Sequence, residues 1–418
     1  MPDVSANSAS RSDVPSRKTS WPTVLMAIAA GALAAFQVGK VHIALPSIRQ
    51  SFSLGLVSAS WILSALNIVG LFAANLTGRL SARIGNKRAV VIGLLLIALA
   101  SAFGALASTL IWLLISRLVE GIGFMAVVVA APSLIVEVTG PRNLRLALAG
   151  WAAYMPGGIA LMTVLAPLIL SQHTRRAVWW LNAFLLSVMA VVITLLAKKG
   201  PSSTAKSRHH YPWNELGQVL TARGPVFLAA IFGMYTIQHL SVMGFMPTLL
   251  HDCFHIAGGR TALLVSIAMA SNIVGNLAAG FLLQRGVPRA WVIASTSIFM
   301  AGMTLAMFAL QLSFPVFYVC AFLFSCVGGI IPSVVMGGAP FHTPTPNLLG
   351  ATNGLLVQGS NLGIVAGPPL MSLIVTHLGW SLVPVMTCAA ALSTVALASS
   401  MRGNTHSIPE YFPSSLDE

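Results

Sequence analysis

The stretch Gly78-Arg79-Leu80-Ser81-Ala82-Arg83-Ile84-Gly85-Asn86-Lys87-Arg88 decides the fold of this chain, because it is a basic link between two long apolar runs. Its two glycines can turn the backbone without the steric cost of a Cβ. We expect a short loop between two membrane helices, held on the cytoplasmic face by its Lys and Arg side chains. A weaker basic copy follows at Gly280 to Arg289, again between apolar runs. The two copies predict a membrane protein built by duplication.

Composition supports a membrane location. Of the 418 residues, 56% are hydrophobic and 8% are charged, whereas soluble domains carry about 25% charged residues. Lipid-facing helices satisfy their backbone internally and present apolar side chains outside. The net charge of +14 is spread over short loops and does not gather on one domain, so we expect no nucleic-acid partner. We therefore predict an all-α integral membrane protein in the lipid bilayer.

Twelve apolar runs are of the length that spans a bilayer, which takes about 20 residues. They are Trp21–Pro46, Gly55–Gly78, Ala89–Ser108, Leu110–Val138, Leu146–Leu170, Val178–Ala197, Pro225–Leu250, Thr261–Leu283, Ala290–Gln311, Phe314–Ala339, Leu349–Thr376 and Ser381–Ser400. The fold expected is twelve transmembrane helices in two pseudo-symmetric six-helix bundles.

The polar segments divide the chain into five parts. Residues 1–20 are rich in Ser, Asp and Arg and have no apolar core, and the run that follows is too long for a signal peptide. The stretch after Ala197 is basic, contains Pro, Ser and His, and has no apolar periodicity. We expect a disordered cytoplasmic tail at 1–20, six-helix bundles at 21–197 and 225–400, a cytoplasmic linker at 198–224, and a second tail at 401–418.

Positive charges indicate the orientation. With the N-terminus in the cytoplasm, the Gly78 stretch, its copy and the linker all lie inside. The cations left outside are Arg49, Arg175, Arg176 and Arg260. Because Lys and Arg are retained on the cytoplasmic side, we expect a multi-pass protein of the cell membrane with both termini in the cytoplasm.

Polar landmarks repeat between the two halves. Gln37 and Pro46 lie nine residues apart in the first run, and Gln238 and Pro247 lie nine apart in the seventh. Asn75 precedes Gly78 as Asn276 precedes Gly280. Although Gly and Pro are common in membrane helices, several landmarks at nearly one offset favour duplication over chance. A transporter made of two parallel repeats has this pattern.

The opening stretch resembles the loop signature of the major facilitator superfamily, G-x-L-x-D-R-x-G-R-K/R. The matching residues are Gly78, Leu80, Arg83, Gly85, Lys87 and Arg88. In the family, an acidic residue thought to help close the cytoplasmic side stands where this chain has Ala82. The resemblance implies a gating role for Gly78, Arg83, Gly85 and Arg88, and for Gly280 and Arg285 in the copy, but the usual gating contact lacks its carboxylate.

Two further stretches carry the resemblance. Arg117 to Gly123 reads Arg-Leu-Val-Glu-Gly-Ile-Gly and is similar to the family segment R-x-x-Q-G-x-G, with Glu120 in place of glutamine. The eleventh run, from Gln358 to Pro369, looks most like the cyanate-permease-like transporters. A glycine-proline signature of antiporters is matched only in part, by Gly150, Pro156, Gly157 and Gly158. Drug or proton antiport therefore remains open.

Three charged residues lie inside the predicted spans away from their ends, where charge is costly and usually functional. Lys40 lies six residues before Pro46, at the outer end of the first run, and Arg117 and Glu120 lie seven and ten residues into the fourth. At 1.5 Å per residue both sets lie roughly 9 to 15 Å below the outer surface. If they share one cavity, two cations and one carboxylate make a net positive site that suits a small anion.

Alternative roles for these charges remain. Arg117 and Glu120, three apart on one helical face, could simply neutralise each other, while Lys40 extends towards the outer surface. Glu120 could instead bind a coupling proton, since desolvation and nearby cations act in opposite directions on a carboxylate.

Other polar residues in the spans are weaker candidates. Gln37, Gln238 and His239 lie in repeat-related runs and could line the cavity from both halves; the alternative for His239 is a hydrogen bond to a neighbouring helix. Tyr154 and Asn361 could add an aromatic wall or a hydrogen bond, or could serve helix packing.

Two features near the helix ends allow narrower hypotheses. His251 and His255 are four apart and would suit a metal if the segment were helical, but we favour a solvated loop and predict neither a metal nor a cofactor. Glu137, at the inner end of the fourth run, could contact Arg83 or Arg88 and partly replace the missing loop carboxylate.

The function predicted is secondary active transport of a small organic or inorganic anion, coupled to protons, by alternating access in a monomer. The chain has no phosphate-binding P-loop and no paired catalytic carboxylates outside the membrane, so we expect no enzyme. Proton-coupled efflux of drugs or metabolites is the main alternative. A membrane sensor that binds a solute without moving it is an alternative of another class.

Overall fold

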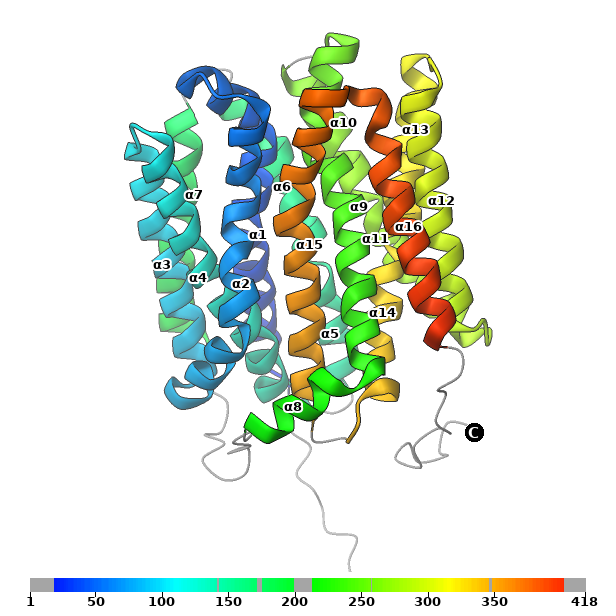
Figure 1. Ribbon diagram of the computed structural model, residues 1–418. Coiled ribbons are helices and arrows are strands. Elements are labelled where there is room, and N and C mark those ends of the chain that lie inside the picture. Colours follow the sequence, from blue (N-terminus) through cyan, green and yellow to red (C-terminus); the bar gives the residue numbers. More distant parts are fainter. Residues whose placement is uncertain are drawn as a thin grey trace, which may run out of the picture.

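The computed structural model describes residues 19–140, 143–170, 175–198, 213–256, 258–345 and 348–401, with only the backbone at 73–82, 145, 149, 152, 167, 175 and 213–216 (Figure 1). These residues form helices joined by short turns, and no strand occurs among them. The helices are α1 (Trp21–Phe52), α2 (Leu56–Ile84), α3 (Asn86–Leu106), α4 (Leu110–Val138), α5 (Leu144–Ala152), α6 (Tyr154–Leu170), α7 (Arg175–Leu196), α8 (Trp213–Thr221), α9 (Arg223–Phe254), α10 (Gly258–Ala270), α11 (Asn272–Gln284), α12 (Arg289–Ala309), α13 (Phe314–Gly328), α14 (Ile330–His342), α15 (Leu349–Leu378) and α16 (Val383–Ser400), with a 3₁₀ turn at Trp380–Leu382.

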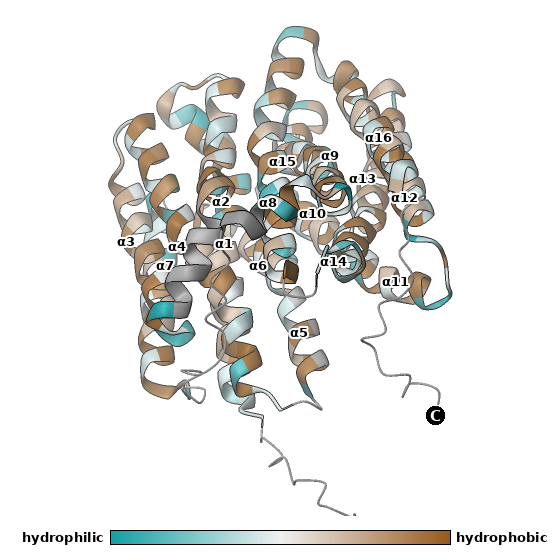
Figure 2. Cartoon of the chain, turned by 60° about the horizontal axis from the view of Figure 1, so that its bottom comes forward, coloured by the Kyte–Doolittle hydropathy of each residue, from teal (hydrophilic) through white to brown (hydrophobic). Residues whose placement is uncertain are grey.

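The helices reproduce the twelve predicted spans. Within the described residues, ten are long and apolar enough to cross a membrane, and Leu56–Phe72 and Tyr154–Leu170 are shorter apolar helices. Figure 2 shows mostly hydrophobic residues along the helices, with hydrophilic ones more frequent near the helix ends. Large apolar side chains such as Leu99 and Leu195 are 70% and 74% exposed, as expected where lipid replaces water. The predicted fold class is confirmed.

Three of the predicted spans are broken into two helices. The fifth run is interrupted at Ala153 between α5 and α6, the eighth at Ser271 between α10 and α11, and the tenth at Gly329 between α13 and α14. The Ser271 hydroxyl donates to the Ala268 carbonyl at 2.7 Å and competes with the backbone ladder. A Cβ at Gly329 would lie 2.0 Å from the Asn272 carbonyl oxygen. The last two breaks therefore lie beside each other, where α11 crosses the α13–α14 junction.

The two halves, α1–α7 and α9–α16, meet mainly along two helix pairs, α2 with α15 and α6 with α10, and more narrowly where α1 lies beside α9. The Gln358 Nε2 donates to the Leu71 carbonyl at 3.2 Å, and the Ser266 hydroxyl donates to the Ala160 carbonyl at 3.2 Å. A buried apolar cluster joins Leu45 and Ile48 of the first half to Phe245 and Met371 of the second. This cluster lies on the side of the bundle where α1 ends and α2 begins. The opposite side is the one where α1 begins and α16 ends.

The predicted linker contains a helix that the sequence pattern did not indicate. We expected 198–224 to be without periodic structure, but α8 forms at Trp213–Thr221 and α9 begins directly after it, at Arg223. Val219 of α8 is fully buried against Leu348 and Ala351. One short apolar face therefore docks α8 on the start of α15, a contact between segments far apart in the sequence that a local pattern cannot reveal.

The predicted loop at Gly78 to Arg88 is mostly helical. Helix α2 continues to Ile84, and Gly85, with φ of +90°, is the one residue between α2 and α3. Only a glycine adopts this conformation without strain. In the second copy, Gly280 lies inside α11, Arg285 caps that helix, and Gly286 makes the turn with φ of +76°. The loop expectation was therefore wrong for Gly78 and Gly280, while side-chain contacts of Gly78 and Ala82 lie outside the described residues.

Glu137 does not pair with Arg83 or Arg88 among the described side chains. Its Oε1 instead accepts a hydrogen bond from the Asn86 Nδ2 at 2.8 Å, and both arginines are exposed. Asn86 opens α3 next to the end of α4 and is close enough to donate directly. The expected ion pair is replaced by a hydrogen bond that fixes the turn after α2.

We expect Glu137→Ala and Asn86→Ala to act on the same interaction. Each should cost roughly 1 kcal/mol of unfolding free energy, the net value of one such hydrogen bond, and the double variant should cost little more than either single variant. Thermal unfolding of the purified variants in detergent measures this. In the control pair Glu137→Ala with Arg83→Ala the two losses should be additive, and coupling there would restore the ion-pair hypothesis.

Candidate functional site

Lys40, Arg117 and Glu120 meet inside the first half. Lys40 comes from α1 and the other two from α4. The Lys40 Nζ lies 2.7 Å from Glu120 Oε1, and the Arg117 Nη1 contacts the other carboxylate oxygen, Oε2. Their exposed fractions are 0%, 1% and 0%. The equal depths read from the sequence are confirmed, and Glu120 bridges the two cations.

Lys40 is contacted by side chains of three other helices, α3, α4 and α7, and does not extend towards the surface. Its ammonium donates to Ser101 Oγ of α3 at 3.0 Å and lies 4.7 Å from the centre of the Trp179 ring of α7. The Ser101 hydroxyl donates in turn to the Trp179 carbonyl at 3.0 Å. The expectation that Lys40 extends towards the outer surface was wrong, because its ammonium has two hydrogen-bond partners and an aromatic ring inside the bundle.

The triad carries a net charge of +1 and retains an unused donor. Two cations share one carboxylate, and within the described residues the Arg117 Nε is buried without a hydrogen-bond partner. A buried donor without a partner costs about 1 to 3 kcal/mol. The guanidinium is therefore the group of the triad with unused hydrogen-bonding capacity.

His42 is a residue that the sequence analysis missed. It lies on α1 two residues beyond Lys40, is 2% exposed, and its Nδ1 has no partner among the described atoms. Its ring faces α9, where a Cβ at Gly244 would lie 3.6 Å from the Nε2. A histidine inside an apolar run next to Lys40 was the signal that could have identified it.

Gln37 and Gln238 are fully buried, and each makes a hydrogen bond within its own half. The Gln37 Nε2 donates to Asn182 Oδ1 of α7 at 3.1 Å. The Gln238 Nε2 donates to the Thr387 carbonyl of α16 at 2.7 Å. Each glutamine thus joins the first helix of its half to the last, which is a symmetric packing role. Among the described atoms, the Gln37 Oε1 is buried without a hydrogen-bond partner, and a role of either glutamine in lining a cavity stays a prediction.

His239 belongs to a polar cluster in the second half. Its Nε2 lies 3.2 Å from Ser325 Oγ and 3.4 Å from Asn272 Nδ2, and its ring is stacked on Tyr235, with 5.5 Å between ring centres. These residues come from α9, α11 and α13. The alternative of a hydrogen bond to a neighbouring helix is thus observed, and the cluster fixes the imidazole beside the region of His42.

Tyr154 and Asn361 lie at helix contacts away from the triad. The Tyr154 ring stacks on Trp151 at 4.2 Å, and both pack against Gly31, nine residues before Lys40 on α1. Asn361 is 5% exposed in α15, and a Cβ at Gly70 of α2 would lie 2.3 Å from its Nδ2. Both positions fit the packing alternative, and a role in binding remains a prediction.

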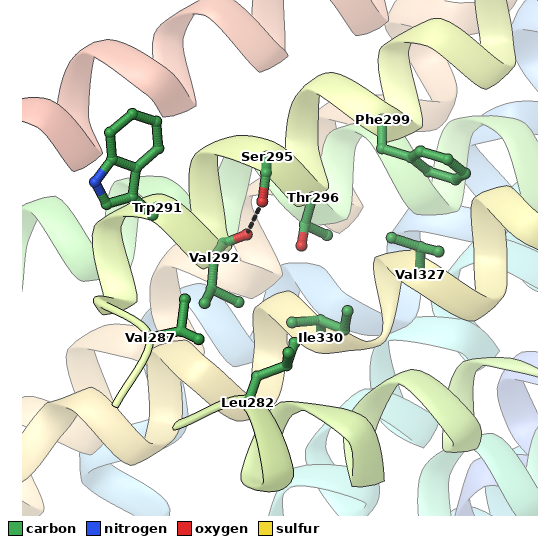
Figure 3. Close-up of a pocket in the computed structure, with 9 residues that line it drawn as sticks. All are labelled: Leu282, Val287, Trp291, Val292, Ser295, Thr296, Phe299, Val327 and Ile330. Atoms are coloured by element: carbon green, nitrogen blue, oxygen red, sulfur yellow. Dashed lines mark hydrogen bonds between the residues drawn. The ribbon is translucent and has the colours of Figure 1, made fainter. Parts of the chain in front are cut away.

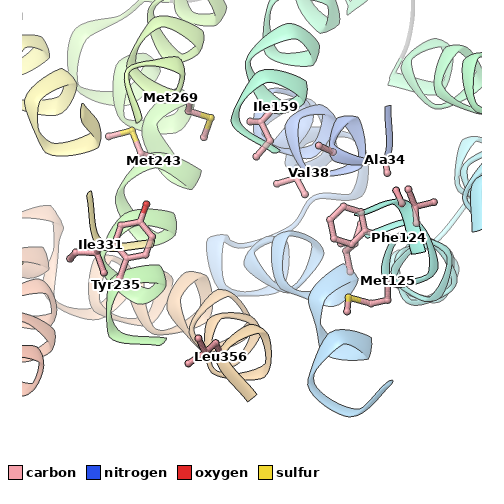
Figure 4. Packing of buried hydrophobic residues seen from close by; sticks show 14 of the residues in the cluster. Ala34, Val38, Phe124, Met125, Ile159, Tyr235, Met243, Met269, Ile331 and Leu356 are labelled. Atoms are coloured by element: carbon pink, nitrogen blue, oxygen red, sulfur yellow. The ribbon is translucent and has the colours of Figure 1, made fainter. Parts of the chain in front are cut away.

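Buried apolar residues lie next to the triad on α1 and α4. Phe124 lies one turn beyond Glu120 on α4, and Val38 lies on α1 just before Lys40. With Met243 and Tyr235 of α9, they belong to a buried cluster drawn from both halves (Figure 4).

His251 and His255 do not share a helical face. His251 lies in the last turn of α9, where its Nδ1 is 2.9 Å from Asp252 Oδ1, and His255 is the capping residue with φ of +54°. No group of three or more metal-ligand side chains occurs among the described residues.

Comparison with known proteins identifies the family. The sequence profile described as the Major Facilitator Superfamily matches residues 27–355 and 226–413. The chain belongs to this superfamily. The family and its fold are those of transporters and not of enzymes.

Superfamily relatives of two kinds are similar to the chain. The lincomycin resistance protein of Streptomyces lincolnensis is 29% identical over 219 residues, 52% of this chain and 44% of that protein. The cyanate transport protein CynX of Escherichia coli is 27% identical over 250 residues, 59% of this chain and 61% of that protein. The chain thus spans about half the length of the curated relatives it matches.

A solved superfamily structure shares the fold over nearly its whole length. It is a bacterial homologue of the human lysosomal transporter Spinster, in an inward-facing and occupied conformation. The TM-score is 0.74 at 14% sequence identity, and the match covers 91% of this chain and 94% of the other.

Proposed function

We propose that the chain is a secondary transporter that moves a small organic or inorganic anion across the cell membrane, coupled to protons, by alternating access between its two halves. The observation that carries this proposal is the buried triad with a net charge of +1. An unpaired buried charge is costly, so an anion bound there would supply the missing counter-charge. CynX, a relative named for cyanate transport, is consistent with an anion as substrate.

The unused donor of Arg117 and the nitrogen of His42 define where the anion would bind. Arg117 Nε and His42 Nδ1 are both buried without partners among the described atoms. A guanidinium suits an anion through charge-assisted hydrogen bonds. A protonated imidazole in a buried site needs a counter-charge, which the anion would also supply. Anion and proton would therefore bind together, as in symport, with the proton on His42.

Glu120 is better suited to holding the cations than to carrying the proton. It is the only carboxylate that contacts Lys40 and Arg117 within the described part of the chain. Protonating it would leave two buried cations without a counter-charge. We therefore assign Glu120 a positioning role.

We expect one class of small anions to stabilise the purified protein against heat. At a concentration of 100 times Kd, a ligand of the folded state adds about 2.7 kcal/mol to the unfolding free energy. Lys40→Met, which removes the net positive charge, should abolish this effect. The control Arg260→Met removes the same charge from an exposed position and should keep it. Carboxylates, cyanate-like anions and lipophilic cations form the panel, and proteoliposome uptake in a proton gradient tests movement.

Proton-coupled efflux of a drug or metabolite is the second candidate, favoured by the lincomycin resistance protein among the relatives. It becomes the better assignment if only lipophilic cations or neutral drugs stabilise the protein and Lys40→Met has no effect. Anion binding without uptake would instead indicate a solute sensor.

The arrangement proposed in the membrane is a monomer with both termini in the cytoplasm. The basic positions at Arg83, Lys87 and Arg88 of the first half and Arg285 and Arg289 of the second lie at helix ends on the side where α1 begins, which is the distribution typical of cytoplasmic faces.

A further inference from the structure

A pocket lies on the outside of the bundle, in the second half. It has a volume of about 340 Å³ and is formed by α11, α12 and the α13–α14 junction (Figure 3). Val327 and Ile330, on either side of the break at Gly329, form one wall, and residues of α12 form the other. The pocket thus lies where the tenth span bends.

This pocket opens towards the lipid. Trp291 and Phe299 at its two ends are 58% and 36% exposed, although they lie in an apolar spanning helix. They are eight residues apart, roughly 12 Å along α12. The lining is apolar except for Ser295 and Thr296, and the Ser295 hydroxyl is already bonded to the Val292 carbonyl at 3.2 Å. A pocket of this shape and polarity suits a hydrocarbon chain and not a polar solute.

Two arginines flank the end of the pocket at the helix termini. Val287, which lines it, lies in the turn between Arg285 and Arg289. The Arg285 guanidinium lies 4.1 Å from the Phe281 ring centre and that of Arg289 lies 4.0 Å from the Phe341 ring centre. Neither has a carboxylate partner among the described residues, and the Arg289 Nε is buried without a hydrogen-bond partner. The aromatic contacts position both cations but leave their charges without a counter-ion.

We propose that this pocket binds an anionic phospholipid of the adjacent leaflet. One acyl chain lies along α12 between Trp291 and Phe299, and the phosphate binds Arg285 and Arg289. Basic pockets between membrane helices at the cytoplasmic side recognise anionic head groups in this way, and a tryptophan at the interface is typical of the depth of the head groups. The site is separate from the triad, since it lies in the other half, and does not depend on the transported solute.

The experiment measures lipid retention by native mass spectrometry of the full chain. The protein is exchanged from mixed micelles containing equal amounts of palmitoyl-oleoyl phosphatidylglycerol and palmitoyl-oleoyl phosphatidylcholine, which have the same chains. We expect one phosphatidylglycerol to be retained preferentially, and Arg285→Gln/Arg289→Gln to weaken it about tenfold or more. The control Arg88→Gln/Lys198→Gln removes the same charge from exposed positions of the first half and should retain the lipid.

A second variant tests the acyl-chain part of the site. Ser295→Trp projects an indole into the pocket from an exposed position of α12 and should also lose the retained phosphatidylglycerol. Equal retention of both lipids by the unchanged protein, or unchanged retention in the arginine double variant, would overturn the proposal. Unchanged retention in Ser295→Trp, or competition by soluble glycerol phosphate, would also overturn it, because the arginines would then bind a head group without a chain in the pocket.

Discussion

Glu120→Gln is expected to destabilise the protein by about 3 to 5 kcal/mol, the cost of removing one partner from a buried ion pair. The carboxylate contacts both Lys40 and Arg117, and all three side chains are at most 1% exposed. The substitution keeps the volume and removes the charge, so the site changes from a net charge of +1 to +2. The loss should appear as a lower unfolding midpoint in detergent.

Lys40→Met is the matched comparison, because it lowers the net charge of the same site whereas Glu120→Gln raises it. It leaves Arg117 and Glu120 as a neutral pair, and Ser101 still donates to the Trp179 carbonyl. We expect a loss of stability less than half that of Glu120→Gln, although anion binding should disappear. Folding and anion binding are thereby separated in one variant.

The double variant Lys40→Met/Glu120→Gln tests whether unbalanced buried charge causes the loss of stability in Glu120→Gln. It has one buried cation instead of the two left by Glu120→Gln, so we expect it to be more stable than that single variant. A double variant that loses the sum of the two single losses would contradict the argument, since independent packing defects add and coupled charges do not. Circular dichroism of each variant confirms that the helices are retained.

Gly275→Ala is expected to cost about 3 kcal/mol, because an added methyl group has no space. Gly275 lies in α11 where that helix crosses α13, and a Cβ there would lie 1.9 Å from the Cys326 carbonyl oxygen and 3.1 Å from the Gly329 Cα. Both neighbours are backbone atoms, so the contact is relieved only when the helices move apart.

Gly280→Ala, in the same helix, is the matched control. No atom lies within 4 Å of a Cβ placed there, and alanine is favoured over glycine inside a helix by up to about 1 kcal/mol. Thermal unfolding of the two variants compares the same chemical change with and without space for it. A similar loss in both variants would contradict the packing argument and restore a special role for Gly280.

The double variant Gly275→Ala/Gly329→Ala tests whether both glycines allow the same close approach between α11 and the α13–α14 junction. A Cβ at Gly329 would lie 2.0 Å from the Asn272 carbonyl of α11. Because either methyl group must push the same two helices apart, the double variant should lose clearly less than the sum of the two single losses. Additive losses would mean that the two glycines relieve separate contacts.

Local signals predicted the turn at Gly85 and the common depth of the three charged residues. They did not predict the partners of the polar side chains. Gly85 was expected to turn the chain and does so with a positive φ. Lys40, Arg117 and Glu120 were expected at one depth because helical rise converts residue number into distance. Whether Lys40 points inward depends on Ser101 and the Trp179 ring, which come from other helices.

The same limit explains His42 and the two glutamines. In a soluble helix, the alternation of polar and apolar faces shows which side is buried. In α1 and α9 apolar residues cover nearly every face, so the pattern does not show which neighbour a polar side chain will meet. Gln37 was therefore assigned to the central path although it joins α1 to α7, and His42 was not recognised at all.

The sequence by itself determined the membrane class, the twelve spans and the duplication, because these follow from composition, run length and repeated landmarks along one chain. Three contacts became visible only in the folded chain: Glu120 bridges two cations, Asn86 replaces the expected arginine partner of Glu137, and α11 lies so close to α13 that a Cβ at Gly275 would be 1.9 Å from the Cys326 carbonyl oxygen. Each of these contacts joins helices whose relative rotation is set by packing, and no local pattern in an apolar run specifies that rotation.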